Sequence, residues 1–148
     1  MFRPFAVALL LAVPVVAAAA EAETATTDQG LAVTINRAGE LAVGGVVLVQ
    51  LRDKSVCESM SQRADRITSR LVNALERIHR RSRFKQIRVA VAPPAPDEPP
   101  GEPWVVVEGV RLFKVTYQDA VAAKRPAAEL AAHYANQERR GLRRIYTP

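Results

Sequence analysis

The apolar pattern over residues 56–82 is the feature that most constrains the fold of this chain. Ser55 followed by Glu58 has the spacing of a capping box, which marks the start of a helix. One apolar side chain then recurs every three or four positions, and this spacing forms a stripe along an α-helix. The stripe consists of Val56, Met60, Ala64, Ile67, Leu71, Leu75 and Ile78. The pattern predicts an amphipathic helix over residues 56–82, with one face that must be buried.

Short apolar or alternating segments on both sides of this helix predict strands. Gly44-Gly45 and Glu108-Gly109 are typical of hairpin turns between two such segments. A second amphipathic helix is expected after Pro126. The expected strands are residues 31–43, interrupted by a turn or bulge at 36–39, then 46–51, 87–91, 104–107 and 110–115. The second apolar stripe consists of Ala127, Leu130, Ala131, Tyr134, Ala135, Leu142 and Ile145.

The resulting order, ββαβββα, predicts a two-layer α+β sandwich in which two amphipathic helices cover one small, mostly antiparallel sheet. Residues 31–148 are expected to form this single domain. The segment 93–103 holds six of the ten prolines, so we expect a stiff, exposed loop there. No repeat of fixed period is evident.

The first twenty residues have the layout of a secretory signal peptide. Arg3 gives a positive start, residues 5–16 are almost wholly apolar, and residues 17–20 are all alanine. The apolar stretch is shorter than the roughly 20 residues that span a bilayer, so an uncleaved anchor is the less favoured alternative. We expect a cleaved signal peptide over 1–20, a disordered linker over 21–30, and a periplasmic or secreted domain without a transmembrane segment.

The chain is basic and has a single cysteine. Its formal net charge is +6, and 17 of its 21 basic residues are arginine. Such a charge permits contact with anionic polymers or lipid headgroups. Cys57 has no partner for an internal disulfide, so packing must stabilise the domain. The sequence is compatible with a homo-oligomer, in which two chains are linked through Cys57 or pair through an exposed edge strand.

Arginines gather on one flank of the first apolar stripe when residues are placed at intervals of about 100°. These residues are Arg63, Arg66, Arg70, Arg77, Arg80 and Arg81. One interpretation is an anion-binding surface for a wall polymer, lipopolysaccharide or an anionic membrane. The other is a solvated helix face whose arginine stems cover apolar surface. Nucleic acid is a less suitable partner, because no aromatic platform and no nucleic-acid-binding motif accompanies the charge.

Candidate residues for catalysis are sparse. His79 and His133 are the only histidines, and neither has a carboxylate or a second histidine at metal-ligand spacing. The chain has no nucleophile elbow and no phosphate-binding glycine loop. Thr116 and Asp119 are expected to cap a short helical turn at 120–123. The sequence therefore predicts neither an enzyme nor a metal or cofactor site.

Several short motifs occur in an order that resembles a known family. They are Gly45-Val46-Val47, Leu51-Arg52, Arg63-Ala64, Ile67, Arg70-Leu71, Val115-Thr116, Asp119-Ala120, Glu129-Leu130-Ala131 and Tyr134-Ala135. Over residues 43–142 they resemble the small extracytoplasmic domain that precedes the membrane segments of some bacterial small-conductance mechanosensitive channel proteins. The resemblance implies an accessory, non-catalytic envelope domain, here without pore-forming helices and with an added proline-rich loop.

We therefore expect a periplasmic binding or adaptor domain whose partner is an envelope protein. The alternative is a domain that binds an anionic envelope polymer or membrane through the arginine-rich helix face.

Overall fold

The computed structural model describes residues 23–27, 30–36, 39–53, 60–80 and 86–146. The expected signal peptide, Cys57 and Arg81 lie outside these residues. Within them, the strands are β1 (Glu23–Thr26), β2 (Ala32–Ile35), β3 (Glu40–Val43), β4 (Val46–Gln50), β5 (Val89–Ala92), β6 (Trp104–Val107) and β7 (Val110–Lys114). The helices are α1 (Met60–Arg80), α2 (Tyr117–Ala123) and α3 (Ala127–Tyr146). The predicted α+β class is confirmed, and no described helix is long and apolar enough to cross a membrane.

The strands form two antiparallel sheets, β1-β2-β3-β4 and β5-β6-β7, where one sheet was expected. The linker prediction is wrong for residues 23–26, which form β1 and pair with β2. Residues 31–43 form two strands because the chain reverses at Asn36. The Asn36 side-chain oxygen accepts a hydrogen bond from the Glu40 N–H at 3.0 Å, and Gly39 takes a φ of 81°. Alternating apolar and polar residues on both sides of a turn do not show whether one strand continues through a bulge or the chain reverses into a second strand.

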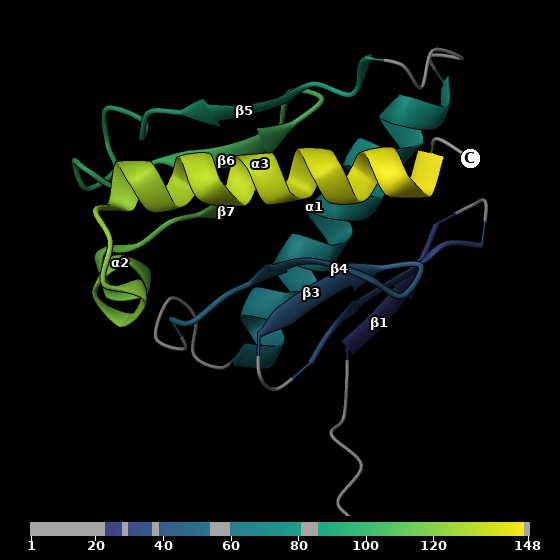
Figure 1. Cartoon of the computed structure of the whole chain (residues 1–148), viewed down its shortest axis with the longest axis horizontal. Helices are drawn as coiled ribbons and strands as arrows, with labels where there is room; N and C mark the ends of the chain where they lie inside the picture. The colour runs from purple at the N-terminus through teal and green to yellow at the C-terminus, as the bar shows by residue number, and fades with distance from the viewer. Residues whose placement is uncertain (1–22, 28–29, 37–38, 54–59, 81–85, 147–148) are drawn as a thin grey trace, which may run out of the picture.

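The two long helices lie between the two sheets and contact both. In Figure 1, α3 runs across the front with β5 above it and β3 and β4 below it, while α1 passes behind. Helix α1 contacts β1, β2 and β7, and α3 contacts β4, β5 and β6. The core is formed by apolar side chains from both sheets and both helices, including Leu41, Ile67, Phe113 and Leu142.

A repeat that was not evident from the sequence relates residues 40–51 to residues 104–115, at an offset of 64. Each segment has a four-residue strand, a two-residue turn and a five-residue strand. The turns have nearly the same φ values, 54° and 80° at Gly44-Gly45, 50° and 79° at Glu108-Gly109. The register shifts at the same place in both hairpins, so Leu48 and Leu112 are both bulged out of the pairing. The identical pairs are Val43/Val107, Gly45/Gly109, Val46/Val110 and Leu48/Leu112.

The same offset relates the long helices that follow the hairpins. The buried positions Ile67, Leu71, Ala74 and Ile78 of α1 correspond to Ala131, Ala135, Glu138 and Leu142 of α3, which are also buried. Each helix packs against the last strand of the other half, α1 against β7 and α3 against β4. The proline-rich loop is an insertion in the second half: the paired residues Ile35 and Leu41 are six positions apart, and Val91 and Val105 are fourteen apart.

Candidate functional site: the groove between α1 and β7

Three of the α1 arginines hold the outer edge of β7. Arg63, Arg70 and Arg77 donate to the backbone carbonyls of Lys114, Leu112 and Glu108, at 3.3, 3.2 and 3.2 Å. The fourteen helical residues between the first and last arginine rise about 21 Å, and the six strand residues between their partners extend about 20 Å. The seven-residue spacing therefore matches the length of the strand edge. These side chains satisfy carbonyls that an open edge would offer to another chain.

Arg63 is also the centre of a buried hydrogen-bonded cluster. Its Nη2 lies 2.8 Å from Oδ2 of Asp119, and the two side chains are 4% and 0% exposed. Asp119 Oδ1 accepts the backbone N–H groups of Arg52 and Asp53, at 3.0 and 2.6 Å. The expectation that Arg63 belongs to an anion-binding surface is wrong, because the arginine is buried and its charge is compensated by Asp119.

Asp119 also belongs to the capping box at the start of α2, as expected. The Thr116 hydroxyl accepts the Asp119 N–H at 3.0 Å, and the Asp119 carboxylate accepts the Thr116 N–H at 3.3 Å. Burial of the Asp119 carboxylate acts to raise its pKa. The hydrogen bond and charge of Arg63, together with the backbone N–H groups of Asp53 and Arg52, outweigh this effect and hold the pKa below the usual 3.8.

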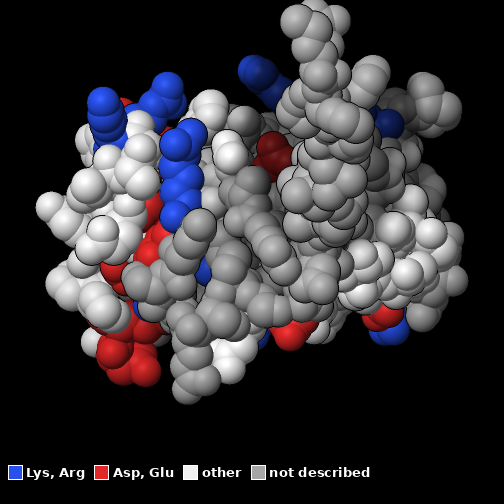
Figure 2. Space-filling model, turned by 90° about the horizontal axis from the view of Figure 1, so that it is seen from below, with Lys and Arg blue, Asp and Glu red and all other residues white. Residues whose placement is uncertain are grey.

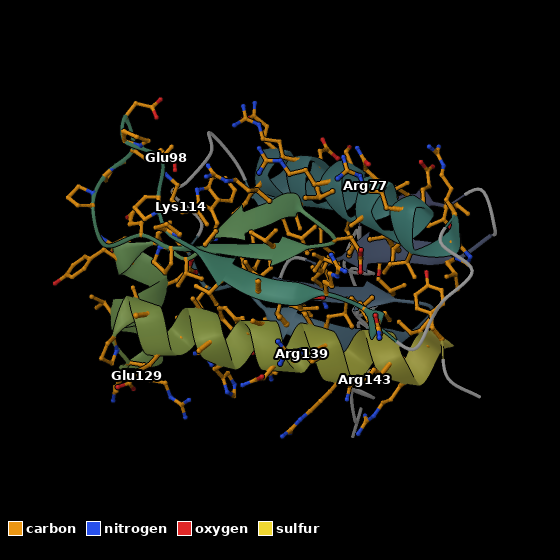
Figure 3. The ribbon with its side chains drawn as sticks, turned by 90° about the horizontal axis from the view of Figure 1, so that it is seen from above. Arg77, Glu98, Lys114, Glu129, Arg139 and Arg143 are labelled. Atoms are coloured by element: carbon orange, nitrogen blue, oxygen red, sulfur yellow. The ribbon has the colours of Figure 1, made fainter. Side chains whose placement is uncertain are left out.

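The other arginines of the predicted surface are spread along α1. Arg66 and Arg80 are exposed, and Arg80 lies 3.9 Å from Glu76 on the same helix. Arg77 is exposed near the end of α1 (Figure 3). The six arginines therefore do not form one continuous surface. Three of them donate hydrogen bonds along β7, and one of these three, Arg63, is buried. Arg81 lies outside the described residues.

A groove of about 330 Å³ opens between α1 and the end of the second sheet. Arg66, Arg70 and Lys114 line it together with Glu98 and the largely buried ring of Trp104. Two of these cations lie close to the Trp104 ring centroid, Arg70 at 5.3 Å and Lys114 at 5.7 Å. Figure 3 shows Lys114 and Glu98 side by side at this end of the sheet. The structure thus places three of the predicted arginines, Arg63, Arg66 and Arg70, in one concave site. Arg63 is buried there and paired with Asp119, so only Arg66 and Arg70 offer their charge to the groove.

Glu98 fixes the proline-rich loop against this groove. Its Oε2 accepts the backbone N–H of Ala95 at 2.7 Å and the indole N–H of Trp104 at 2.8 Å. These two hydrogen bonds, in this order, lower the pKa of Glu98. Its other oxygen lies 3.6 Å from Lys114 Nζ. Sequence reasoning missed Trp104 and Glu98 because residue 104 was expected only to begin a strand and the segment 93–103 was expected to be an exposed loop.

In the described part of the chain, histidine, cysteine and acidic side chains form no group of three or more that could hold a metal ion. His79 lies 3.1 Å from the Tyr146 hydroxyl, where the ends of α1 and α3 meet. His133 is exposed on α3. Figure 2 shows the lower face of the molecule, where basic and acidic side chains both gather toward the end at which α2 lies in Figure 1.

Comparison with protein families adds one finding. The model of a family described as a domain of unknown function, DUF8459, matches residues 40–145. The chain belongs to this family. The matched DUF8459 range begins at β3 and extends to the last turn of α3, so it contains both halves of the repeat and the groove. No curated protein and no solved structure matches the chain.

Proposed function

We propose that this DUF8459 chain is an exported, non-catalytic binding domain that recognises an anionic component of the cell envelope in the groove between α1 and β7. The observation that carries this proposal is the convergence of Arg66, Arg70 and Lys114 beside Trp104 in one concave site. An anionic wall polymer, lipopolysaccharide or an anionic membrane surface would supply the complementary charge.

The cations of the groove keep donors that an incoming anion can reach. Arg66 is exposed and forms no ion pair with a described residue. Arg70 uses Nη1 for the Leu112 carbonyl, and a guanidinium carries further donors. Lys114 Nζ lies 3.6 Å from Glu98 and 3.7 Å from Glu102, distances at which an ion pair contributes little when it is partly solvated. An incoming anion can therefore compete for these three side chains.

Export and an envelope role are supported by the sequence of the first twenty residues and by the resemblance to the extracytoplasmic domain of mechanosensitive channel proteins. The absence of catalysis is proposed because the most buried carboxylate cluster is committed to backbone N–H groups and Arg63. Such a cluster stabilises the fold and has no free acid or base.

A protein partner is the second candidate. Tyr117 and Val121 are 68% and 53% exposed and lie one turn apart on α2. Residues four positions apart lie on the same side of a helix, so these two side chains offer one small apolar surface to another protein. An adaptor role would use this side of α2, beside the groove, because the Tyr117 N–H donates to Glu102 of the proline-rich loop.

The test uses Trp104, the only tryptophan, as a reporter inside the groove. Its fluorescence would be followed while heparin or vesicles of anionic lipid are added at several salt concentrations. Each cation near an anionic surface contributes about 1 kcal/mol. Arg66→Gln with Lys114→Gln should therefore weaken binding about 30-fold.

The control is Arg80→Gln with Arg140→Gln, which removes the same charge from exposed positions away from the groove. The control variant should bind as the unmodified protein does. Equal weakening in both variants would mean that net charge alone attracts the ligand, and an unchanged Trp104 signal would reject the groove as the site.

A further inference from the structure

A second hollow, of about 300 Å³, lies between the end of β4, α2 and the start of α3. Three basic residues line it: Arg52 after β4, Lys124 at the end of α2, and Arg125 before α3. No carboxylate is among its lining residues. No residue of α1 lines this second hollow.

All three basic residues are exposed, and hydrogen bonds of their backbone N–H groups fix the backbone from which they extend. The Arg52 N–H donates to buried Asp119 at 3.0 Å. The N–H groups of Lys124 and Arg125 donate to α2 carbonyls, both at 3.1 Å, and Lys124 takes a left-handed φ of 54° at the end of α2. The positions from which these side chains extend are therefore fixed before any ligand binds.

None of the three cations forms an ion pair with a described residue. Like charges gathered in a hollow repel one another, and this repulsion opposes folding. The remaining lining supplies an apolar wall from Leu130 and Tyr134. We therefore expect a ligand to supply the negative charge that compensates these three cations.

The second hollow and the groove occupy equivalent positions in the two repeated parts of the fold. Gln50, Leu130 and Tyr134 of the second hollow correspond, at the offset of 64, to Lys114, Arg66 and Arg70 of the groove. The fold thus builds a concave site twice, between a helix and the end of the strand that the helix covers. In the second hollow the cations come from the chain segments around α2 instead of from the helix and strand.

We propose that the second hollow is a binding site for a phosphate monoester. Two guanidinium groups and an ammonium group match the oxygens of a phosphoryl group. A phosphate monoester carries close to two negative charges above pH 7, so it compensates three cations better than a carboxylate does. This site goes beyond the proposed groove, because the two sites share no lining residue.

The two histidines of the chain provide a matched pair of reporters. His133 lines the second hollow, whereas His79 contacts Tyr146 and lines neither site. The ring signals of both would be followed by NMR at pH 7.5 during titration with glucose 6-phosphate, with glucose at the same ionic strength as reference. We expect a saturable change at His133 and none at His79. Arg52→Gln with Arg125→Gln should weaken the binding at least tenfold, whereas Arg140→Gln with Arg143→Gln should not.

No saturable change at His133 in the millimolar range would overturn the proposal, as would unchanged binding by the Arg52 and Arg125 variant. Vesicles with and without phosphatidic acid distinguish the source of the phosphate: binding only to the soluble ester indicates a soluble ligand, and binding to the vesicles indicates a lipid headgroup. The Trp104 fluorescence test reports on the groove alone, so either site can fail without the other.

Discussion

Nη2 of Arg63 lies 2.8 Å from Oδ2 of Asp119, and this buried ion pair joins the two halves of the repeat. Arg63 belongs to the helix of the first half, and Asp119 belongs to the capping box of the second. Asp119 also accepts the N–H groups of Arg52 and Asp53, at the end of the first hairpin. One carboxylate therefore fixes the end of β4, the start of α2 and the first turns of α1 together.

Asp119→Asn should destabilise the domain by about 3 kcal/mol, because removal of one partner leaves the other charge buried. The measurement is urea unfolding at pH 7. Asp97→Asn is the matched control, since Asp97 is exposed in the proline-rich loop, and it should change the free energy of unfolding little. Equal values for the two variants would show that the ion pair does not stabilise the fold.

Acid should destabilise the domain through protonation of the same residue, Asp119. The folded-state pKa of Asp119 lies below the usual 3.8, so its contribution to stability is complete above about pH 4 and is lost as the pH falls below that value. Unfolding of Asp119→Asn should be less sensitive to pH in this acid range than unfolding of the unmodified protein. Parallel curves for the two proteins between pH 2 and 4 would contradict the assignment.

Glu138 should make the domain less stable as the pH rises. Its side chain is fully buried and has no hydrogen-bond partner among the described residues, and burial raises its pKa to about 8. The folded protein then binds a proton that the unfolded chain has released. The free energy of unfolding should fall between about pH 4.5 and pH 8, by at most about 1.4 kcal/mol per pH unit.

Glu138→Gln should remove this fall, whereas Glu129→Gln, at an exposed position on the same helix, should retain it. Denaturant unfolding at several pH values provides the comparison. A pH slope that persists in Glu138→Gln would assign the titration to another group. The corresponding position of the first half is Ala74, so the repeat itself does not require a carboxylate here.

Gly141→Ala should destabilise the protein even though alanine favours helices. A Cβ atom at Gly141 would lie 2.2 Å from Cδ2 of Leu48, the bulged residue of β4, which is buried. Overpacking of this kind costs about 1–3 kcal/mol, more than the roughly 1 kcal/mol that alanine gains over glycine in a helix. Gly141→Ala combined with Leu48→Val should be less destabilised than the sum of the two single variants. Additive effects would show that the two residues do not clash.

Arg70→Met should destabilise the fold, whereas Arg66→Met should not, although both residues line the groove. Methionine keeps much of the apolar stem but leaves the Leu112 carbonyl without its Arg70 donor, which costs about 1–3 kcal/mol. Arg66 is exposed, so its substitution should change stability by less than about 0.5 kcal/mol. Thermal unfolding would show the difference. Equal stability of the two variants would mean that the Arg70 contact with the strand edge contributes nothing.

The local elements of this domain could be predicted from the sequence, but their partners could not. The periodicity of α1 predicted a helix and its buried stripe, and glycine-containing turns predicted both hairpins. Nothing in the alternation of residues 31–51 indicates which strands share a sheet, because pairing depends on contacts between distant segments. For the same reason the helical projection placed Arg63 beside Arg66 and Arg70 but did not show that Asp119 faces it.

The repeat was missed for a different physical reason. Fold symmetry is carried by turn geometry, by a bulge and by buried positions, and each of these tolerates several residue types. Leu48 and Leu112 are identical, but Glu138 stands where Ala74 does, and Glu108 takes the positive φ of Gly44. The proline-rich insertion also changes the spacing before β6. The second hollow, formed by side chains from β4, α2 and α3, had no local sequence signal at all.

The exchange of helices between the halves, α1 on β7 and α3 on β4, has a consequence for the origin of the domain. A half-length unit with one hairpin and one helix could not cover its own last strand, because that strand is covered by the helix of the other half. Two such units would have to associate and trade helices. The chain has the arrangement expected of two hairpin–helix units that have exchanged helices and are joined in one polypeptide, with the proline-rich loop present in only one of them.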